Sequence, residues 1–169
     1  CAREADALGK PSFAYAFLLD HAPEERERGV TIEASTAFFE AVGREINILD
    51  APGHRDFVPA MVGAAAQADA VLLVLNASPG ELEAGFAGQT LEHLRVARCL
   101  GSSALLVAVN QMDAVGYARQ GFDEVVAASR SVLVRAGYDP GTTRFVPVSA
   151  LHGAGLTDAS SPPGLGWYD

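Results

Sequence analysis

The sequence predicts an α/β fold, a mostly parallel sheet with helices on both faces. Three observations favour it: apolar runs of strand length, helical segments with apolar residues on one face between them, and glycines that end those segments. Strand–helix–strand connections produce parallel pairs through right-handed crossovers. With 169 residues, 49% of them hydrophobic, the chain is expected to form about one domain with a single sizeable core.

The N-terminal half contains a predicted hairpin followed by a helix. Strands are expected over residues 35–42 and 45–50, paired antiparallel across a tight turn at Gly43-Arg44. The alanine-rich segment 57–68 is compatible with a helix, provided that Pro59 lies in its first turn.

Strands and helices alternate over the second half. Buried strands are expected over 70–77 and 103–110, and a shorter strand over 144–149. The helices between them are expected over 90–100, ended by Gly101, and over 122–136, ended by Gly137. Because parallel sheets bind ligands at the carboxyl ends of their strands, the polar residues at those ends are candidate site residues.

Charge and composition exclude several classes of protein. A net charge of -9 argues against a broad phosphate-binding surface, and so against direct DNA binding. No apolar run is long enough to span a membrane, and no secretory signal is present. Two cysteines, Cys1 and Cys99, favour a reducing compartment, so a cytoplasmic location is expected. The chain begins with Cys1 and not with methionine, which suggests a fragment.

The first candidate motif is Asp50-Ala-Pro-Gly-His54, directly after a predicted strand. A carboxylate at a strand end can hold Mg²⁺, usually through water. Gly53 allows close approach of the backbone, so that its N–H can face a phosphate oxygen, and His54 can lie near an attacking water. Taken alone, the motif is also compatible with an ordinary turn.

The second candidate segment, residues 25–32, lies upstream of that motif. Its alternating charges predict an exposed, mobile stretch, and for residues 25–28 alone a solvated face is the simpler interpretation. Thr31 stands apart, because a hydroxyl in such a loop can contact a metal ion and a terminal phosphate when the loop folds over.

The third motif, Asn110-Gln-Met-Asp113, also follows a predicted strand. An aspartate can accept two hydrogen bonds from the N1–H and the exocyclic amine of guanine, and adenine offers neither donor. Ser149, Ala150 and Leu151 close a further strand, where backbone N–H groups are expected to reach a carbonyl of the base. Each motif is weak alone, but their order and spacing together are the pattern of a guanine-nucleotide GTPase.

The chain resembles the GTP-binding (G) domain of translational GTPases of the elongation factor one-alpha group, which has a P-loop-type fold. The segments that carry the resemblance are GKPSFAYAFLLD (9–20), ERERGVTIE (25–33), DAPGHRDFVPAMVGAAAQADAVLLV (50–74), GELEAGFAGQTLEHL (80–94) and VAVNQMD (107–113). Within the group, the chain resembles more closely the ribosome-rescue GTPase that partners Pelota and the related termination GTPase. The sulfate-activation GTPase subunit shares the same frame but fits less well.

The resemblance implies roles for individual residues. It makes Thr31 a ligand of Mg²⁺ and of the γ-phosphate, Asp50 a carboxylate that holds Mg²⁺ through water, and Gly53 the γ-phosphate sensor. His54 orients the attacking water, and Val30 belongs to an apolar gate that keeps His54 away from it. The implied cofactors are GTP or GDP and Mg²⁺. The implied partners are the ribosome and a tRNA-like, release or rescue factor, while rescue, termination and elongation roles remain alternatives.

Two departures from the family pattern affect these expectations. No Gly-x-x-x-x-Gly-Lys-[Ser/Thr] motif occurs in the chain, so the first strand and the phosphate-binding loop are expected to be absent, and the chain alone to be inactive. Gln111 stands where the family has lysine. These departures keep a second hypothesis open, a degenerate GTPase-like binding module without hydrolysis. Residues 1–156 are expected to form the partial G domain and 157–169 a linker toward a following domain.

Overall fold

The computed structural model divides the chain into two compact units, 1–68 and 69–169. The structure describes Ala5, Ala7, Gly9 and Gly80, together with residues 15–20, 22–78, 89–156 and 164–168. Parts of two segments that carry the family resemblance, 10–14 and 81–88, lie outside the described residues, as does most of the tail expected to be a linker.

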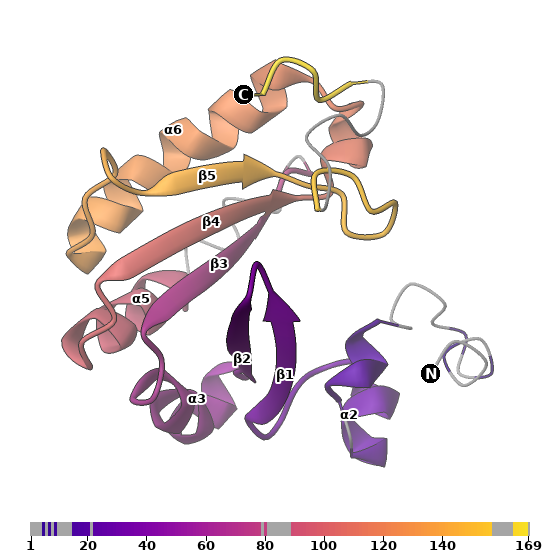
Figure 1. Ribbon diagram of the computed structural model, residues 1–169, viewed down its shortest axis with the longest axis vertical. Helices are drawn as coiled ribbons and strands as arrows, with labels where there is room; N and C mark the ends of the chain where they lie inside the picture. The colour runs from indigo at the N-terminus through magenta and orange to yellow at the C-terminus, as the bar shows by residue number, and fades with distance from the viewer. Residues whose placement is uncertain are drawn as a thin grey trace. The chain divides into compact units, whose positions relative to one another are not determined.

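The first unit contains an antiparallel hairpin of β1 (Ser35–Ala41) and β2 (Arg44–Asp50), as the sequence predicts (Figure 1). Ala41 pairs with Arg44, so the turn lies at Val42 and Gly43, one residue earlier than expected. Both turn residues have positive φ angles, 53° and 67°. A type I′ turn, the two-residue hairpin turn whose twist matches that of the strands, requires positive φ at both positions. Gly43 adopts this conformation without strain, and Val42 is fully exposed there.

Short helices flank the hairpin in the chain. Helix α2 (Pro23–Arg28) ends at Gly29, whose φ of 71° permits the left-handed C-cap, and a short 3-10 turn, η2 (Ala16–Leu18), precedes it. A second 3-10 turn, η3 (Arg55–Phe57), follows β2 and leads into α3 (Val58–Ala65). Pro59 lies in the first turn of α3, the part of a helix that tolerates proline, as expected.

The second unit is built on a three-stranded parallel sheet in the order β3–β4–β5. Its strands are β3 (Ala70–Asn76), β4 (Ala104–Asn110) and β5 (Arg144–Pro147). Helix α5 (Thr90–Cys99) precedes β4, and α6 (Arg119–Ala136) precedes β5 (Figure 1). The order of elements is therefore the strand–helix–strand alternation that the sequence predicts.

The core of the second unit lies on one face of this sheet. Leu75, Val107 and Val109 are buried with apolar residues of both α5 and α6. On the opposite face, Leu72 and Val74 of β3 are 60% and 56% exposed. The apolar run of β3 therefore has one packed face among the described residues, although its composition is typical of a strand covered on both.

The last described segment, 164–168, packs on the second unit. The Trp167 indole N–H donates to the carbonyl of Tyr117 at 2.9 Å, and the Trp167 ring centroid lies 5.4 Å from that of Phe122. The Tyr168 hydroxyl donates to the carbonyl of Phe145 at 2.7 Å. Trp167 and Tyr168 are thus partly buried and pack against the core of the second unit.

The α/β class predicted from the sequence is confirmed: the described chain combines a parallel three-stranded sheet with helices. In the part of the chain that the structure describes, no helix combines the length and apolar character that a membrane span requires.

Candidate functional site

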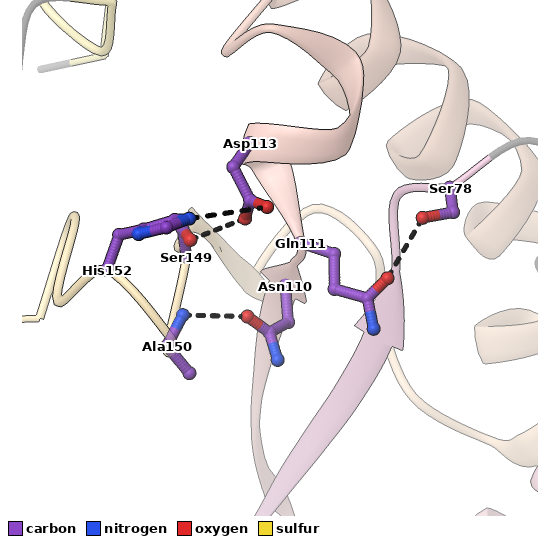
Figure 2. A network of polar contacts seen from close by, with 7 residues as sticks. All are labelled: Ser78, Asn110, Gln111, Asp113, Ser149, Ala150 and His152. Atoms are coloured by element: carbon purple, nitrogen blue, oxygen red, sulfur yellow. Dashed lines mark hydrogen bonds and ion pairs between the residues drawn. The ribbon is translucent and has the colours of Figure 1, made fainter. Parts of the chain in front are cut away.

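The polar residues that follow β4 and β5 lie together in the second unit. Because the two strands are parallel neighbours, the loops at their carboxyl ends meet at one edge of the sheet. Figure 2 shows Asn110, Asp113, Ser149 and Ala150 facing one another across these two loops. Four of the predicted guanine-binding residues are therefore brought into one place by the sheet.

Asn110 connects the two loops through its side chain. Its Oδ1 atom accepts a hydrogen bond from the backbone N–H of Ala150 at 2.9 Å, across 40 positions of sequence. Its backbone carbonyl accepts from the N–H of Ala77 at 2.8 Å, which also fixes the chain that leaves β3. The asparagine therefore joins three loops, and its side-chain N–H₂ group has no protein partner among the described residues.

Asp113 is held by two residues of the second loop. Its Oδ1 accepts a hydrogen bond of 2.5 Å from the Ser149 hydroxyl, and its Oδ2 lies 3.8 Å from Nε2 of His152. Ser149 is fully buried, while the Asp113 side chain is 31% exposed. A buried hydroxyl thus fixes the orientation of a carboxylate that remains partly exposed and has further acceptor capacity.

Backbone hydrogen bonds of Met112 anchor the turn that carries Asp113. Met112, which begins the 3-10 helix η4 (Met112–Val115), is fully buried, and its N–H donates to the carbonyl of Val148 at 3.2 Å. Gln111 precedes it with a left-handed φ of 61°. The carbonyl of Met112 accepts from the N–H of Tyr117 at 2.8 Å, which closes the loop. Asp113 therefore projects from a short, anchored turn.

The second loop is closed by an antiparallel bridge. Ser149 and Ala154 exchange two backbone hydrogen bonds, each of 3.0 Å. Gly155 follows with a φ of 71°, and a Cβ atom at this position would lie 2.3 Å from the carbonyl oxygen of Pro147. Only glycine fits there, so the loop that carries Ser149 and Ala150 depends on a residue that the sequence motifs did not single out.

This arrangement leaves donors and acceptors that match guanine. The outward carboxylate positions of Asp113 can accept from N1–H and the exocyclic amine. The backbone N–H groups of Ser149 and Ala150 are already used, by Ala154 and Asn110 respectively. Of the three N–H groups expected to reach a base carbonyl, the one of Leu151 has no protein partner among the described residues. The side chain of Leu151 is 58% exposed.

The other predicted site residues, Val30, Thr31, Asp50, Gly53 and His54, all belong to the first unit. Thr31 donates its hydroxyl to Oδ1 of Asp20 at 3.1 Å. Asp20 is buried, and no motif in the sequence pointed to it as a partner of Thr31. The Thr31 hydroxyl is thus held by a carboxylate of its own unit.

Glu25 fixes the segment that carries Thr31. Its side chain accepts from the N–H of Ala22 at 3.0 Å, of Ile32 at 2.8 Å and of Glu33 at 3.2 Å. Glu25 is only 4% exposed. The interpretation of residues 25–28 as a solvated face is therefore wrong for Glu25, because three backbone N–H groups offset the cost of burying its charge. A glutamate three residues after a helix N-cap is the sequence signal for the first of these bonds.

Asp50, the last residue of β2, lies in an environment of negative charge. Partial burial raises the pKa of its carboxyl, and repulsion from Asp20 and Glu25 raises that pKa further. Carboxylate oxygens are the ligands that Mg²⁺ prefers, and a divalent cation would offset this repulsion, so the donor chemistry fits the metal. Within the described ranges, no group of three or more His, Cys, Asp or Glu side chains is arranged to hold a metal ion.

Gly53 and His54 follow Asp50 on an exposed turn. A Cβ atom at Gly53 would meet nothing within 4 Å, and its φ is not in the left-handed region, so the described protein does not itself require glycine there. His54 caps η3, because its Nδ1 accepts from the N–H of Asp56 at 3.3 Å. Val30 is 37% exposed.

The fold and these loops define a class: an α/β domain whose parallel sheet brings an Asn-x-x-Asp loop and a Ser-Ala loop together at one edge. A family model described as the elongation factor Tu GTP binding domain matches residues 2–161. The chain belongs to this family.

Several curated relatives share close to half of the sequence. Elongation factor 1-alpha of Pyrobaculum calidifontis is 49% identical over 166 residues, which cover 97% of this chain and 37% of that protein. Protein HBS1 of Drosophila melanogaster is 43% identical, over 98% of this chain and 25% of that protein. The chain therefore spans about a third of the length of the curated relatives it matches.

Solved structures show the same fold. The structure of sup35 complexed with GDP matches with a TM-score of 0.67 and 31% identity, over all of this chain and 40% of that one. The bacterial selenocysteine-specific elongation factor EF-Sec matches with a TM-score of 0.69 and 27% identity, over 81% of this chain and 22% of that one. The resemblance found in the sequence motifs is thus confirmed.

Proposed function

We propose that this chain is the guanine-nucleotide switch domain of a translation factor that binds and hydrolyses GTP. The observation that carries the proposal is the Asp113 carboxylate, which is fixed by buried Ser149 beside Asn110 and remains 31% exposed. A carboxylate held in this way accepts two hydrogen bonds from guanine. It disfavours adenine, because adenine would remove water from the carboxylate without offering it a donor, which costs binding free energy.

The residues of the first unit are proposed to serve the phosphate end. Open space around Gly53 permits close approach of its backbone to the γ-phosphate. Thr31 and, through water, Asp50 would hold Mg²⁺, which when bound neutralises charge on the phosphate oxygens. To bind Mg²⁺, the Thr31 hydroxyl would give up its hydrogen bond to Asp20. His54, on an exposed turn, would orient the attacking water, with Val30 as part of the gate that restrains it.

The partners are proposed from the relatives. Elongation factor 1-alpha, protein HBS1 and sup35 support the ribosome and a tRNA-like, release or rescue factor as partners, in the cytoplasm. Among these roles, the similarity to protein HBS1 favours ribosome rescue. We also propose that residues 1–156 act as the partial G domain and 157–169 as the link to a neighbouring domain. The chain holds no Gly-x-x-x-x-Gly-Lys-[Ser/Thr] loop, so we propose that it is inactive alone.

The test is a change of base specificity in the full-length protein. Asp113→Asn replaces one acceptor with an N–H₂ donor, which matches the 2-oxo group of xanthine and not the 2-amino group of guanine. We expect kcat/KM for GTP to fall by about a hundredfold or more, and hydrolysis of XTP to rise above it.

The matched control is Asp123→Asn, which removes an exposed carboxylate on α6 that pairs with Arg119. This control should keep the preference for GTP. An Asp113→Asn protein that still prefers GTP contradicts the proposed base site. A wild-type protein that binds GTP and releases no phosphate, alone or with ribosomes, supports the degenerate binding module instead.

A further inference from the structure

Gln111 makes a contact that neither the motif nor the proposed chemistry explains. Its Oε1 accepts a hydrogen bond from the hydroxyl of Ser78 at 2.9 Å, across 33 positions of sequence. Ser78 follows β3, whereas Gln111 follows β4. Figure 2 shows the amide oxygen of Gln111 turned to Ser78, with its nitrogen on the other side. The bond therefore joins the loop after β3 to the loop that carries Asp113.

Ser78 is itself fixed in place. Its N–H donates to Oδ1 of Asn76 at 2.8 Å, which is a local turn at the end of β3. The preceding residue, Ala77, is buried and donates its N–H to the carbonyl of Asn110 at 2.8 Å. The Ser78 hydroxyl thus projects from a short segment that is bonded to its own strand and to the neighbouring one.

Gln111 occupies a strained position between two base-site residues. Its φ of 61° is a left-handed conformation that a side chain disfavours, so other contacts must hold it. It lies between Asn110 and the turn that projects Asp113. Any rotation of the Gln111 backbone moves both, because the loop is short and its far end is anchored through Met112.

We propose that Ser78 and Gln111 form a positioning pair for guanine recognition, in which the Ser78 hydroxyl holds the Gln111 side chain and so keeps the Asn110–Asp113 loop in its binding geometry. The inference rests on the proposed function. It assigns to Ser78, a residue outside every motif, a role in base selectivity. It also gives Gln111 a role that an uncharged amide can fill where the family has lysine.

The experiment is a double-mutant cycle in the full-length protein, with Ser78→Ala, Gln111→Ala and both together. The readouts are the dissociation rate of fluorescently labelled GDP and the ratio of affinities for GDP and IDP, whose base lacks the exocyclic amine. Each single change should speed GDP release about two- to tenfold, the usual range for one hydrogen bond. The double variant should be no worse than the worse single one, and the preference for GDP over IDP should fall in all three.

Two further variants separate positioning from loss of structure. Ser78→Thr keeps the hydroxyl and should retain wild-type GDP release. Ser131→Ala removes a hydroxyl that donates to the carbonyl of Ala128 within its own helix. This variant should change neither readout. Additive effects of the two single changes, or an unchanged GDP/IDP ratio, overturn the proposal.

The outcome is distinguishable from failure of the proposed function. If Asp113→Asn shifts specificity to xanthine while Ser78→Ala leaves GDP release unchanged, the base site stands and the positioning pair is wrong. If the wild-type protein shows no preference for guanine nucleotides, the proposed function itself fails, and the pair fails with it.

Discussion

The proposed base loops of the second unit and the residues of the first unit that we propose for the phosphate end differ in how their polar groups are satisfied. In the base loops, Asn110, Asp113, Ser149 and Ala150 are partners of one another and rest on a buried core. At the proposed phosphate end, partial burial raises the pKa of Asp50, and repulsion from nearby carboxylates raises it further. The proposed base site is therefore preorganised by the protein, whereas the proposed phosphate end has a charge arrangement that a bound cation would relieve.

This difference indicates which substitutions should change the stability of the protein as well as its proposed nucleotide binding. Changes that break the base loops should also cost stability, because the same hydrogen bonds serve both. A change at Asp50 should have the opposite effect on stability, since its repulsion is a cost that the folded chain bears without the metal. Substitutions in the two units test this contrast, beginning with the one expected to cost most.

Gly155→Ala should have the largest effect on stability. The added Cβ would overlap the carbonyl oxygen of Pro147 at 2.3 Å, and the φ of 71° is strained for alanine. We expect a loss of about 2 to 4 kcal/mol in the free energy of unfolding of the second unit. Urea unfolding followed by the fluorescence of Trp167, the single tryptophan, measures it.

Gly153→Ala is the matched control for this change. Gly153 has nearly the same φ, 72°, but nothing lies within 4 Å of its Cβ position. It should cost only the backbone strain, about 1 kcal/mol. Equal losses for the two variants would show that the close approach to Pro147 does not matter to the loop.

Glu25→Ala should have an intermediate effect, confined to the first unit. It leaves the N–H groups of Ala22, Ile32 and Glu33 without their carboxylate acceptor. We expect a local loss of about 1 to 3 kcal/mol. Amide hydrogen exchange should become faster at Ile32 and Glu33, next to Thr31. Glu24→Ala, an exposed neighbour on the same helix, is the control, and similar exchange in both variants would contradict the role of Glu25.

Asp50→Asn should have the smallest effect on stability, and a stabilising one. The pKa of Asp50 is raised in the folded state, so its ionised form opposes folding. Its contribution to stability is present below its unfolded-state pKa of about 3.8 and is lost as the pH rises through the higher folded-state pKa. At neutral pH the variant should therefore protect the amides of β2 better than wild type.

The pH dependence gives the check for Asp50. Wild-type protection should increase as the pH is lowered from neutral toward the folded-state pKa, and this increase should be smaller in Asp50→Asn. Glu33→Gln, at an exposed position of the same unit, should keep the wild-type dependence. Lower amide protection of β2 in Asp50→Asn than in wild type at neutral pH would contradict the predicted stabilising effect.

Much of the fold followed from local patterns. A helix with one apolar face was predicted over 90–100, and Leu91, Leu94 and Ala97 are all buried on α5. Gly137 ends α6 with a φ of 88°, as its position predicted. The hairpin turn was displaced by one residue because cross-strand pairing, and not the preference of Val42, sets its register. Patterns of this kind are local, so they can be found in one sequence.

The amino-acid order alone was enough to predict the elements and the family, because each depends on spacing along the chain. The folded chain was needed to find that Ser149 donates to Asp113, that Ser78 holds Gln111 and that Glu25 is buried. The first two contacts join residues 36 and 33 positions apart. Such pairs exist only where parallel strands bring distant loops to one edge of a sheet, and no local pattern in the chain encodes that proximity.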